Sequence, residues 1–466
     1  MRRLSWTGGY RGFPHTYPCT PLSLDRAQTD VRTISTVQEL LDTFREAEKP
    51  KGRFQVGLEH ERFVYPRGSS EPVAYEGNKG IGALLAAFEP AGYRPFREGP
   101  EGPTIALTKE RLTVSLEPGG QVELSGSPFH TGQEAYAESL RNAADLRAAA
   151  ASLGLVPVCF GYRPWGTPKQ MPWMPKARYA AMHRTLGGRG PLALDMMLMT
   201  CTTQVSLDWA DEADCARKVT VAARLAPLLV ALYANSPLVD GRPVGYQSYR
   251  SRVWNDVDKA RCGYFPALVD GTFSYQAYVD WALDAPLLFL RRNGRYEDPG
   301  LTFRELLKKG YQGTQALASD WTDHLSTLFP EVRLKSVLEV RSADSGSAAT
   351  AGALAALWLG LLYDAQALEA AGRLLPHLTF AEHLAFHAEA QRTGLHGKLG
   401  KLSVSGLVHD MVEIAHEGLL RLDSEDATLL APLEETARTA RSPADVLLAA
   451  YARDKRPESL QAVAAL

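Results

Sequence analysis

The sequence predicts an α+β fold, and two observations support this. Segments with the helical period of 3.6 residues and segments with the strand period of two alternate irregularly, unlike the regular series of strands and helices that builds a parallel sheet. From residue 348 onward the chain consists almost entirely of helix formers, with breaks at Pro376, Gly394, Gly397, Gly400 and Pro432. We therefore expect a sheet-containing core with helices packed on it or appended to it.

The composition excludes several classes of protein. The 466 residues include 51 Lys or Arg and 53 Asp or Glu, a net charge of −2, and 45% are hydrophobic. This composition is globular, and the balanced charge argues against a nucleic-acid partner, because such partners are bound through an excess of Lys and Arg. The five cysteines are widely spaced and form no C-x-x-C pair, which argues against a structural zinc site and against a disulfide framework. We therefore expect a reducing compartment and a cytoplasmic protein.

Two helices can be placed from their ends. Thr131 and Glu134 have the spacing of a capping box, which predicts a helix that ends at about Leu153. A second helix is predicted after Asp211, extending to about residue 235, and we expect Pro227 to kink or split it.

The longest uncharged stretch, residues 345–363, is nominally long enough to cross a bilayer. However, it consists mostly of Ala, Gly, Ser and Thr, with Asp344 and Asp364 at its ends. We predict a buried core helix there, and no membrane partner.

Three predicted strands carry glutamates on one face. In residues 54–61 the period of two places Phe54, Val56 and Leu58 on one face, and Glu59 and Glu61 on the other. The strand at 113–117 ends in Glu117, and the strand at 121–124 contributes Glu123 after a Pro-Gly-Gly turn.

Two further strands add polar and basic groups. The strand at 201–209 places Gln204 on its polar face and Cys201 on its apolar face, where a core position is expected. Residues 333–341, interpreted as one strand, place on one face Arg333, Lys335, Glu339 and Arg341.

A single polar strand face is ordinary, since antiparallel sheets often expose one side to water. Several such faces on one sheet would bring carboxylates and cations together. Paired carboxylates suit a hard, oxygen-liganded ion such as Mg²⁺, and the basic groups suit phosphate charge beside it. Because the chain contains neither a P-loop nor a G-x-G-x-x-G motif, a nucleotide would need a different kind of phosphate-binding site. The residues alone leave open a metal–nucleotide site and a metal-dependent hydrolytic site.

At these segments the sequence resembles the plant and proteobacterial type of glutamate–cysteine ligase. The matching runs include Gly-Leu-Glu-His-Glu-Arg-Phe at 57–63 and Ser-Leu-Glu-Pro-Gly-Gly-Gln-Val-Glu-Leu-Ser-Gly at 115–126. Further runs lie at 174–179, 194–205, 234–237, 250–258 and 329–335. Together they follow the family's order over roughly residues 35–370.

The resemblance implies a fold related to glutamine synthetase, in which a curved antiparallel sheet forms a funnel with helices outside. It also implies that ATP and Mg²⁺ phosphorylate the γ-carboxylate of glutamate, and that the amine of cysteine then displaces phosphate to give γ-glutamylcysteine. The implied partners are therefore small molecules, glutamate, cysteine and ATP, while the choice between monomer and homodimer stays open.

The resemblance also implies site residues. As metal ligands it implies Glu59, Glu61, Glu117, Glu123 and Glu339. As catalytic groups at the transferring phosphoryl group it implies Arg341 and Lys335, together with Glu339. On the glutamate-binding side it implies Arg178, Tyr179, Arg250 and Trp254, with Gln204 as a neutral group near the metals. Each has a plainer alternative: Glu123 as a backbone hydrogen-bond partner, Arg178 as a helix cap and Trp254 as packing.

Three histidines are assigned no part in the chemistry. His60 lies between two acids but faces the other side of its strand, where a core or supporting position is expected. His383 and His387 have the i,i+4 spacing of a metal pair but no acidic partner pattern, so we predict a solvated helix face.

One stretch departs from the family pattern. Where family members continue with Gly-Ala-Asp-Gly-Gly-Pro-Trp, this chain has Ser-Ala-Asp-Ser-Gly-Ser-Ala at 342–348. The phosphoryl step should survive this change, whereas the pocket for the amine acceptor is open to reshaping. Two alternatives to cysteine ligation are therefore a ligase for a different amine or amino acid, and a non-catalytic homologue that binds glutamate or nucleotide.

The resulting division of the chain has three parts. Residues 1–34 are predicted to form an irregular arm, residues 35–375 a catalytic domain, and residues 376–466 a helical C-terminal extension.

Overall fold

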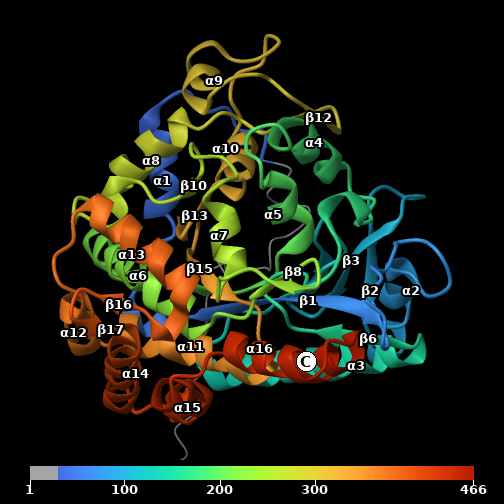
Figure 1. Cartoon of the computed structure of the whole chain (residues 1–466). Coiled ribbons are helices and arrows are strands. Elements are labelled where there is room, and N and C mark those ends of the chain that lie inside the picture. Colours follow the sequence, from blue (N-terminus) through green and yellow to red (C-terminus); the bar gives the residue numbers. More distant parts are fainter. Residues whose placement is uncertain (1–29) are drawn as a thin grey trace, which may run out of the picture.

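The computed structural model describes residues 30–466, so most of the predicted N-terminal arm lies outside the described residues. One large sheet runs through the middle of the described chain, with helices on both of its sides (Figure 1). Its strands are joined by antiparallel pairing, and β6 pairs with β1 beside the main path. In spatial order they are β14 (Val332–Leu334), β15 (Leu338–Asp344), β7 (Thr202–Leu207), β1 (Val56–Pro66), β5 (Val122–Ser125), β4 (Leu112–Leu116), β3 (Thr104–Lys109) and β2 (Arg94–Arg97), with β6 (Leu155–Val158) off this path. The predicted α+β class with an antiparallel sheet is confirmed.

The interpretation of residues 333–341 as a single strand is wrong, because they form a hairpin. β14 and β15 pair antiparallel, with Leu334 opposite Leu338 and Arg333 opposite Glu339. The turn closes where the Lys335 N–H donates to the carbonyl of Val337 at 2.9 Å. Residues that face each other across an antiparallel pair point to the same side of the sheet, so Arg333 and Glu339 still share a face.

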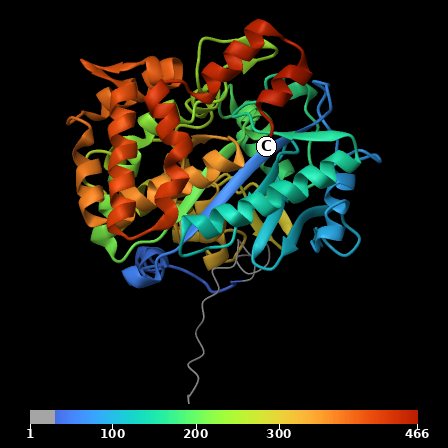
Figure 2. The ribbon, with the colours of Figure 1, turned by 90° about the horizontal axis from the view of Figure 1, so that it is seen from below.

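The apolar face of the sheet is buried against helices. Val56 and Leu58 of β1, Val205 and Leu207 of β7, and Leu338 and Val340 of β15 belong to one core cluster. Against this face pack the long helices α3 (Gly132–Ser152), α6 (Glu212–Leu232) and α11 (Ala348–Tyr363). Figure 2 shows α3 crossing below β1, with the C-terminal helices beside it. Burying alternate side chains in this way leaves the other set on the opposite face.

The two helices predicted from their ends are present. α3 begins after Thr131, whose hydroxyl accepts a hydrogen bond from the Glu134 N–H in a capping box. α6 begins after Asp211 and continues past Pro227 to Leu232 without a break, so the expected split does not occur. Residues 225–232 are all buried, and we attribute the continuity to this packing, which offsets the hydrogen bond that proline cannot make.

α11 is the buried core helix that the sequence predicts. Its residues 351–362 are buried throughout, including Trp358. No single helix among residues 30–466 is long and apolar enough to cross a membrane, and α11 passes that test only together with α12 (Ala365–Leu374), at a bend of 98°.

The C-terminal helices share the core of α11. Val404, Leu407 and Met411 of α14 (Val404–Arg421) and Phe386 of α13 (Phe380–Thr393) belong to the same cluster as the sheet. The remaining C-terminal helices are α15 (Ala431–Thr439), α16 (Pro443–Arg453) and α17 (Pro457–Val463). The division of the chain at residue 376 stays a prediction.

His383 and His387 of α13 do not lie on a solvated face, so that prediction is wrong. Their exposed fractions are 2% and 3%, and both rings pack edge-on against Tyr264. The side of α13 that carries the i,i+4 pair is turned toward α6 and α7 (Tyr249–Trp254), which the helical period alone does not reveal.

A second layer of shorter elements lies on the other side of the sheet (Figure 1). It includes α4 (Ala177–Leu186), α5 (Ala193–Met199), α7 and α10 (Ala318–Ser326). Three further helices are α1 (Val37–Arg45), α8 (Tyr275–Asp284) and α9 (Phe303–Lys309), and α2 (Ile81–Ala86) lies near β3. The short paired strands are β8 (Leu238–Val239) with β9 (Arg242–Pro243), β10 (Cys262–Gly263) with β13 (Phe329–Pro330), β11 (Leu290–Arg292) with β12 (Arg295–Glu297), and β16 (Lys398–Leu399) with β17 (Leu402–Ser403).

Gly360 should be required for the contact between α11 and α14. A Cβ at Gly360 would lie 2.2 Å from the carbonyl oxygen of Ala415, so Gly360→Ala must push the two helices apart. We expect a loss of about 1–3 kcal/mol in the free energy of unfolding, measured by urea denaturation. Gly372→Ala in α12 is the matched control, since its Cβ meets only Val221 at 3.4 Å and alanine favours a helix. Equal stability of the two variants would contradict this account of the packing.

Candidate active site

The polar face of the sheet collects the glutamates that the sequence predicts to share a face. Glu61 of β1 lies directly opposite Glu123 of β5, and Glu59 lies opposite Gln204 of β7. On the next strand Glu339 pairs with Ser206. Cross-strand partners point to the same side, so the register alone brings these groups onto one surface.

The four glutamates of β1, β5 and the β4–β5 turn form what we call the acid cluster: Glu59, Glu61, Glu117 and Glu123. All four side chains are half-buried over the middle of the sheet. Their hydrogen bonds come from neutral groups: the Ser115 hydroxyl donates to Glu123 at 2.8 Å, and the Thr202 N–H donates to Glu61 at 2.9 Å. Among residues 30–466, no Lys or Arg forms an ion pair within 4.0 Å of the acid cluster.

The surroundings of the acid cluster favour the protonated form of each carboxyl. Burial raises the pKa of Glu59 to about 7, and the charges of Glu339 and Glu123 add to the rise. Burial and the neighbouring Glu117 likewise raise the pKa of Glu123 to about 7. The pKa of Glu61 lies well above its ordinary value for the same two reasons, burial and nearby carboxylates. These groups therefore repel one another as anions and are stabilised by any added cation.

Glu339 has the opposite surroundings. Its carboxylate is fully buried and forms ion pairs with Arg333 at 2.6 Å, Lys335 at 2.7 Å and Arg341 at 2.6 Å. Burial alone would raise the pKa of Glu339, but the three cations hold it well below its ordinary value. We call these four residues the cation cluster, because three positive charges surround one negative charge.

Gln204 connects the two clusters across β7. Its side-chain oxygen accepts a hydrogen bond from the Arg341 guanidinium, while its strand position lies opposite Glu59. The sheet order β14–β15–β7–β1–β5–β4–β3–β2 therefore places the cation cluster at one edge of the sheet and the acid cluster next to it, over the middle strands. A ligand that spans this face meets positive charge at one end and carboxylates at the other.

The predicted pair Arg178 and Tyr179 on α4 lies beside the acid cluster, but the two side chains have different contacts. The Tyr179 hydroxyl donates to the Leu116 carbonyl, directly before Glu117. Arg178 donates to the Ser326 hydroxyl at 3.0 Å and lies over the Phe289 ring at 5.5 Å. Both Lys176 and Arg178 counteract the rise that burial causes in the pKa of Glu117.

Lys176 is a site residue that the sequence reasoning missed. Its ammonium lies 3.3 Å from the Tyr179 hydroxyl and lowers the pKa values of Glu117 and Glu123. It belongs to the matched run at 174–179, which is the only signal that pointed to it.

The other predicted glutamate-side pair, Arg250 and Trp254, is brought to the site by α7. Arg250 is buried and donates to the Arg341 carbonyl at 2.9 Å. Trp254 packs against Phe329, with ring centroids 5.3 Å apart, and the Arg341 guanidinium lies 6.0 Å from the Trp254 ring. The Trp254 indole N–H is buried and has no hydrogen-bond partner among residues 30–466.

His60 faces away from the acid cluster, as predicted. Its ring nitrogen Nε2 lies 2.8 Å from the Gly346 carbonyl, and its exposed fraction is 0%. Cys201 is also fully buried, in a separate apolar cluster, as predicted.

The serines that replace family glycines in the stretch 342–348 are bonded within the protein. The Ser345 hydroxyl donates to the Glu61 carbonyl at 2.6 Å, and the Ser342 hydroxyl donates to the Glu331 carboxylate at 2.5 Å. Ser347, at the position of the family's proline, is the N-cap of α11. Of these hydroxyls, that of Ser345 supports the strand that carries Glu61, and those of Ser342 and Ser347 are taken up by Glu331 and by the start of α11.

The chemistry of the acid cluster suits a hard divalent cation. Four carboxylates that form no ion pair with a Lys or Arg of residues 30–466 supply oxygen ligands and an excess of negative charge, which are the requirements of Mg²⁺. As the side chains stand, no three acid, histidine or cysteine groups of the described residues converge to hold an ion, so binding requires the carboxylates to turn inward. Among the five glutamates predicted as metal ligands, Glu339 is the least suited, because its carboxylate already pairs with three cations.

Comparison with known proteins identifies the family of this chain. The model of glutamate–cysteine ligase family 2 matches residues 55–465. Glutamate–cysteine ligases named as chloroplastic are 37% identical over 421 residues in Medicago truncatula and in Arabidopsis thaliana. These alignments cover 89% of this chain, and 82% and 80% of the respective relatives.

The fold is also similar to that of a solved glutamate–cysteine ligase, from Francisella tularensis in complex with AMP. The TM-score is 0.56 at 12% sequence identity, and the alignment covers 88% of this chain and 87% of that chain. At this level of identity the likeness concerns the fold.

The expected cytoplasmic location is contradicted by these relatives, since those of Medicago truncatula, Brassica juncea, Arabidopsis thaliana and Nicotiana tabacum are all named as chloroplastic. That expectation rested on cysteine spacing, which excludes a disulfide framework but does not distinguish one reducing compartment from another.

Replacement of Glu339 by Gln should destabilise the protein. The change leaves Arg333, Lys335 and Arg341 close together without their shared counter-charge, so we expect a loss of about 3–5 kcal/mol in the free energy of unfolding. Urea denaturation measures it, with Glu369→Gln as the control, because the Glu369–Arg373 pair is exposed and its loss should have no measurable effect. Similar stability of Glu339→Gln and wild type would show that the cation cluster does not need this anion.

Proposed function

The chain belongs to glutamate–cysteine ligase family 2, and on that premise we propose that the polar sheet face is its active site. The protein is an ATP-dependent ligase that joins the γ-carboxylate of glutamate to the amine of cysteine, forming γ-glutamylcysteine in glutathione biosynthesis. The observation that carries the site assignment is the placement of the acid cluster and the cation cluster side by side on one face, joined by Gln204.

The reaction must bring two anions together, the triphosphate of ATP and the γ-carboxylate of glutamate. We propose that the γ-phosphoryl group moves to the glutamate carboxylate, which releases ADP and leaves a γ-glutamyl phosphate. The cysteine amine then attacks the γ-carbonyl carbon, an amide bond forms, and phosphate leaves. The first step needs positive charge at the phosphoryl group, because the two anions otherwise repel each other. In the second step the amine loses a proton, and positive charge stabilises the phosphate that leaves.

The acid cluster would hold the divalent cations that such a reaction uses. Glu59, Glu61, Glu117 and Glu123 are the ligands that we propose for Mg²⁺, because no Lys or Arg among residues 30–466 forms an ion pair with them within 4.0 Å. Bound Mg²⁺ supplies positive charge to the phosphate oxygens. The role of Glu339 as a ligand stays a prediction, since its carboxylate is enclosed by the cation cluster.

Arg341 and Lys335 are the groups that we propose to contact the transferring phosphoryl group. Both are held by Glu339, so their charges are already fixed in place before a substrate arrives. Positive groups that need no rearrangement during the reaction stabilise developing charge most effectively.

Glutamate is proposed to bind on the side formed by α4 and α7. An arginine fork suits its α-carboxylate, and Arg178 and Arg250 approach the acid cluster from these two helices. The buried Trp254 indole N–H, which lacks a partner in the described chain, is a donor available to a substrate oxygen.

Cysteine is the acceptor that the names of the relatives support. The altered stretch 342–348 is the one feature that favours a different amine. Its serine hydroxyls are bonded to Glu61, Glu331 and the α11 N-terminus, so they support the sheet and give no evidence of a new acceptor pocket.

An ADP-release assay with ATP, Mg²⁺ and glutamate tests this function, run across a panel of amino acids and amines. We expect stimulation by cysteine, complete loss with a chelator, and recovery when Mg²⁺ is added back. Glu123→Gln should need at least about tenfold more Mg²⁺ for half-maximal rate, because one oxygen ligand and one charge are lost.

Glu71→Gln, at an exposed loop position, is the control and should keep the wild-type Mg²⁺ requirement. If another amine stimulates ADP release and cysteine does not, that amine is the acceptor in place of cysteine. An unchanged Mg²⁺ requirement in Glu123→Gln would remove the acid cluster from the metal site.

A further inference from the structure

Asp344 is a buried carboxylate at the end of the strand that carries Glu339 and Arg341. It is the last residue of β15 and has an exposed fraction of 1%. None of the roles assigned above includes it. It lies where three segments meet: the end of β15, the turn at 235–236, and the start of α7.

Three neutral donors hold this carboxylate. Its Oδ2 accepts hydrogen bonds from the Asn235 N–H at 2.8 Å and the Ser236 hydroxyl at 2.6 Å. Its Oδ1 accepts from the hydroxyl of Ser248, the N-cap of α7, at 2.8 Å. The carboxylate thus fixes the start of the helix that carries Arg250 and Trp254.

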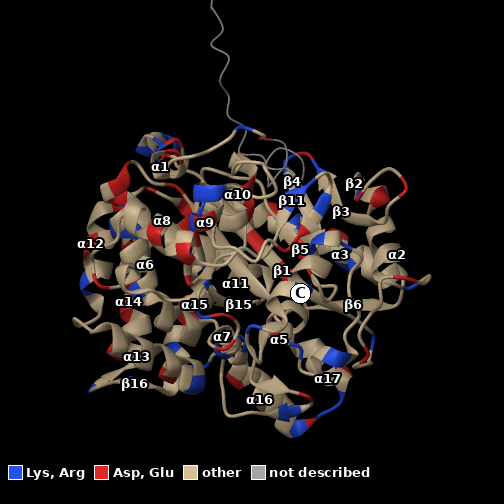
Figure 3. Ribbon diagram, turned by 90° about the horizontal axis from the view of Figure 1, so that it is seen from above, with Lys and Arg blue, Asp and Glu red and all other residues tan. Residues whose placement is uncertain are grey.

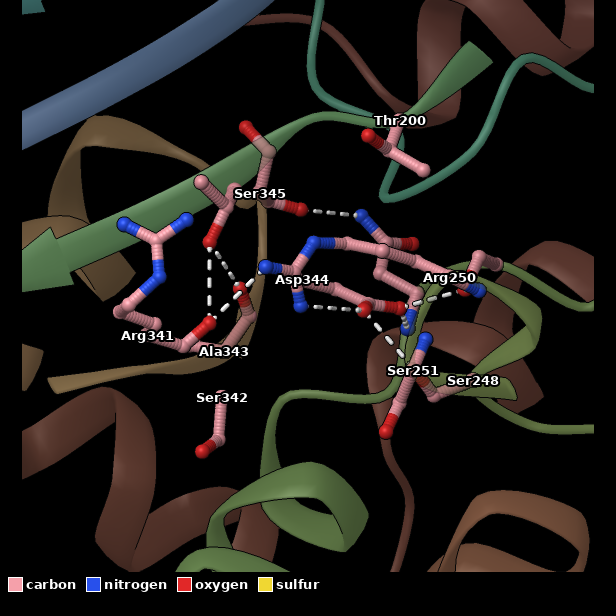
Figure 4. Close-up of polar contacts among 12 residues, drawn as sticks. Thr200, Ser248, Arg250, Ser251, Arg341, Ser342, Ala343, Asp344 and Ser345 are labelled. Atoms are coloured by element: carbon pink, nitrogen blue, oxygen red, sulfur yellow. Dashed lines mark hydrogen bonds and ion pairs between the residues drawn. The ribbon is translucent and has the colours of Figure 1, made fainter. Parts of the chain in front are cut away.

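The remaining contact of Asp344 is with Arg250. Its Oδ1 lies 3.8 Å from Nη1 of Arg250, whose Nη2 donates to the Arg341 carbonyl at 2.9 Å. Figure 4 shows Arg250 pointing toward the end of β15, where Arg341, Ala343 and Asp344 lie. One guanidinium therefore joins the Asp344 carboxylate to the backbone of Arg341.

The Asp344 carboxylate is enclosed by the surrounding chain. A Cβ at Gly161 would lie 2.4 Å from the Asp344 carboxyl carbon, so this side of the carboxylate is closed by backbone. The donors of the 235–236 turn and of α7 hold the carboxylate on its other sides, next to the Arg250 guanidinium.

Arg250 stands between anions on both sides. Asp344, Glu61 and Glu331 act on it as negative neighbours, and Arg341 as a positive one. Without Asp344, the nearest strong attraction for Arg250 would be the acid cluster, where a guanidinium would compete with the metal proposed there. Asp344 therefore counteracts a collapse of Arg250 onto Glu61.

We propose that Asp344 is a positioning residue that holds Arg250, and through it the Arg341 backbone, in the arrangement that binds glutamate. This inference rests on the proposed function, in which Arg250 belongs to the glutamate-binding side. Asp344 acts through Arg250 and does not contact the substrates itself.

The substitution Asp344→Asn removes the negative charge that holds Arg250 but keeps the hydrogen bonds that support the fold. The amide oxygen can accept from the Asn235 N–H and the Ser236 hydroxyl, and the amide nitrogen can donate to the Ser248 hydroxyl, so the three neutral contacts are retained. What is lost is the attraction between a carboxylate and the Arg250 guanidinium.

Steady-state kinetics of the full chain tests the proposal. In Asp344→Asn we expect the KM for glutamate to rise at least about tenfold, with the KM for ATP changed by less than about twofold. Asp214→Asn is the matched control: Asp214 is a buried carboxylate paired with Lys218 at 2.9 Å, outside the proposed site, and its loss should lower the melting temperature with an unchanged glutamate KM.

A wild-type glutamate KM in an active Asp344→Asn would overturn the proposal, and so would a change confined to the melting temperature. If Asp344→Asn does not fold, Ser236→Ala replaces it, since Ser236 contacts both the Asp344 carboxylate and the Arg250 N–H, and an unchanged glutamate KM there would overturn the proposal equally. Wild-type protein that releases no ADP with glutamate and cysteine would refute the proposed function, and this inference with it. If only this inference is wrong, the wild-type protein still releases ADP with glutamate and cysteine, and the variant keeps the wild-type KM for glutamate.

Discussion

The structure depends on keeping four uncompensated carboxylates close together on one face of a sheet. The acid cluster has no basic partner within ion-pair distance in the described chain, and burial together with mutual repulsion raises the pKa values of Glu59 and Glu123 to about 7. Such an arrangement opposes folding unless the strands that carry it are held by other forces. The apolar face of the same strands supplies these forces, since Val56, Leu58, Val205 and Leu207 are buried beneath α3 and α11. Stability and chemistry are thus assigned to opposite faces of one sheet.

The cation cluster and the acid cluster differ in charge because they have different functions in the proposed site. In one part three cations share the buried carboxylate of Glu339, which holds them in place. In the other part no Lys or Arg of the described chain forms an ion pair with the acid cluster, so its half-buried carboxylates can take up a cation from solution. In the view of Figure 3 acidic and basic residues are interspersed around the periphery of the protein. The near-zero net charge therefore conceals a strong local separation of charge within the sheet.

The period of two in the strands was enough to predict which side chains share a face, and the register confirms it for Glu61 and Glu123. The hairpin at 332–344 was missed because its turn lies within an apparently regular alternation, and pairing across the hairpin preserves the same face. The burial of His383 and His387 was missed because helical spacing does not tell which neighbour covers a helix. Contacts such as Arg250 with Asp344, 94 positions apart, follow from tertiary placement and leave no pattern in the sequence.

The central claim is that this face brings the γ-phosphoryl group of ATP to the glutamate carboxylate. Positional isotope exchange tests it most directly, because it reports reversible phosphoryl transfer before any amine reacts. With ATP labelled by ¹⁸O at the non-bridging β-phosphate oxygens, Mg²⁺ and glutamate but no cysteine, the account predicts that label moves into the β,γ-bridge. It also predicts that this movement is lost in Arg341→Ala, which removes a cation held by Glu339. No movement of label in the wild-type protein, or undiminished movement in Arg341→Ala, would contradict the account.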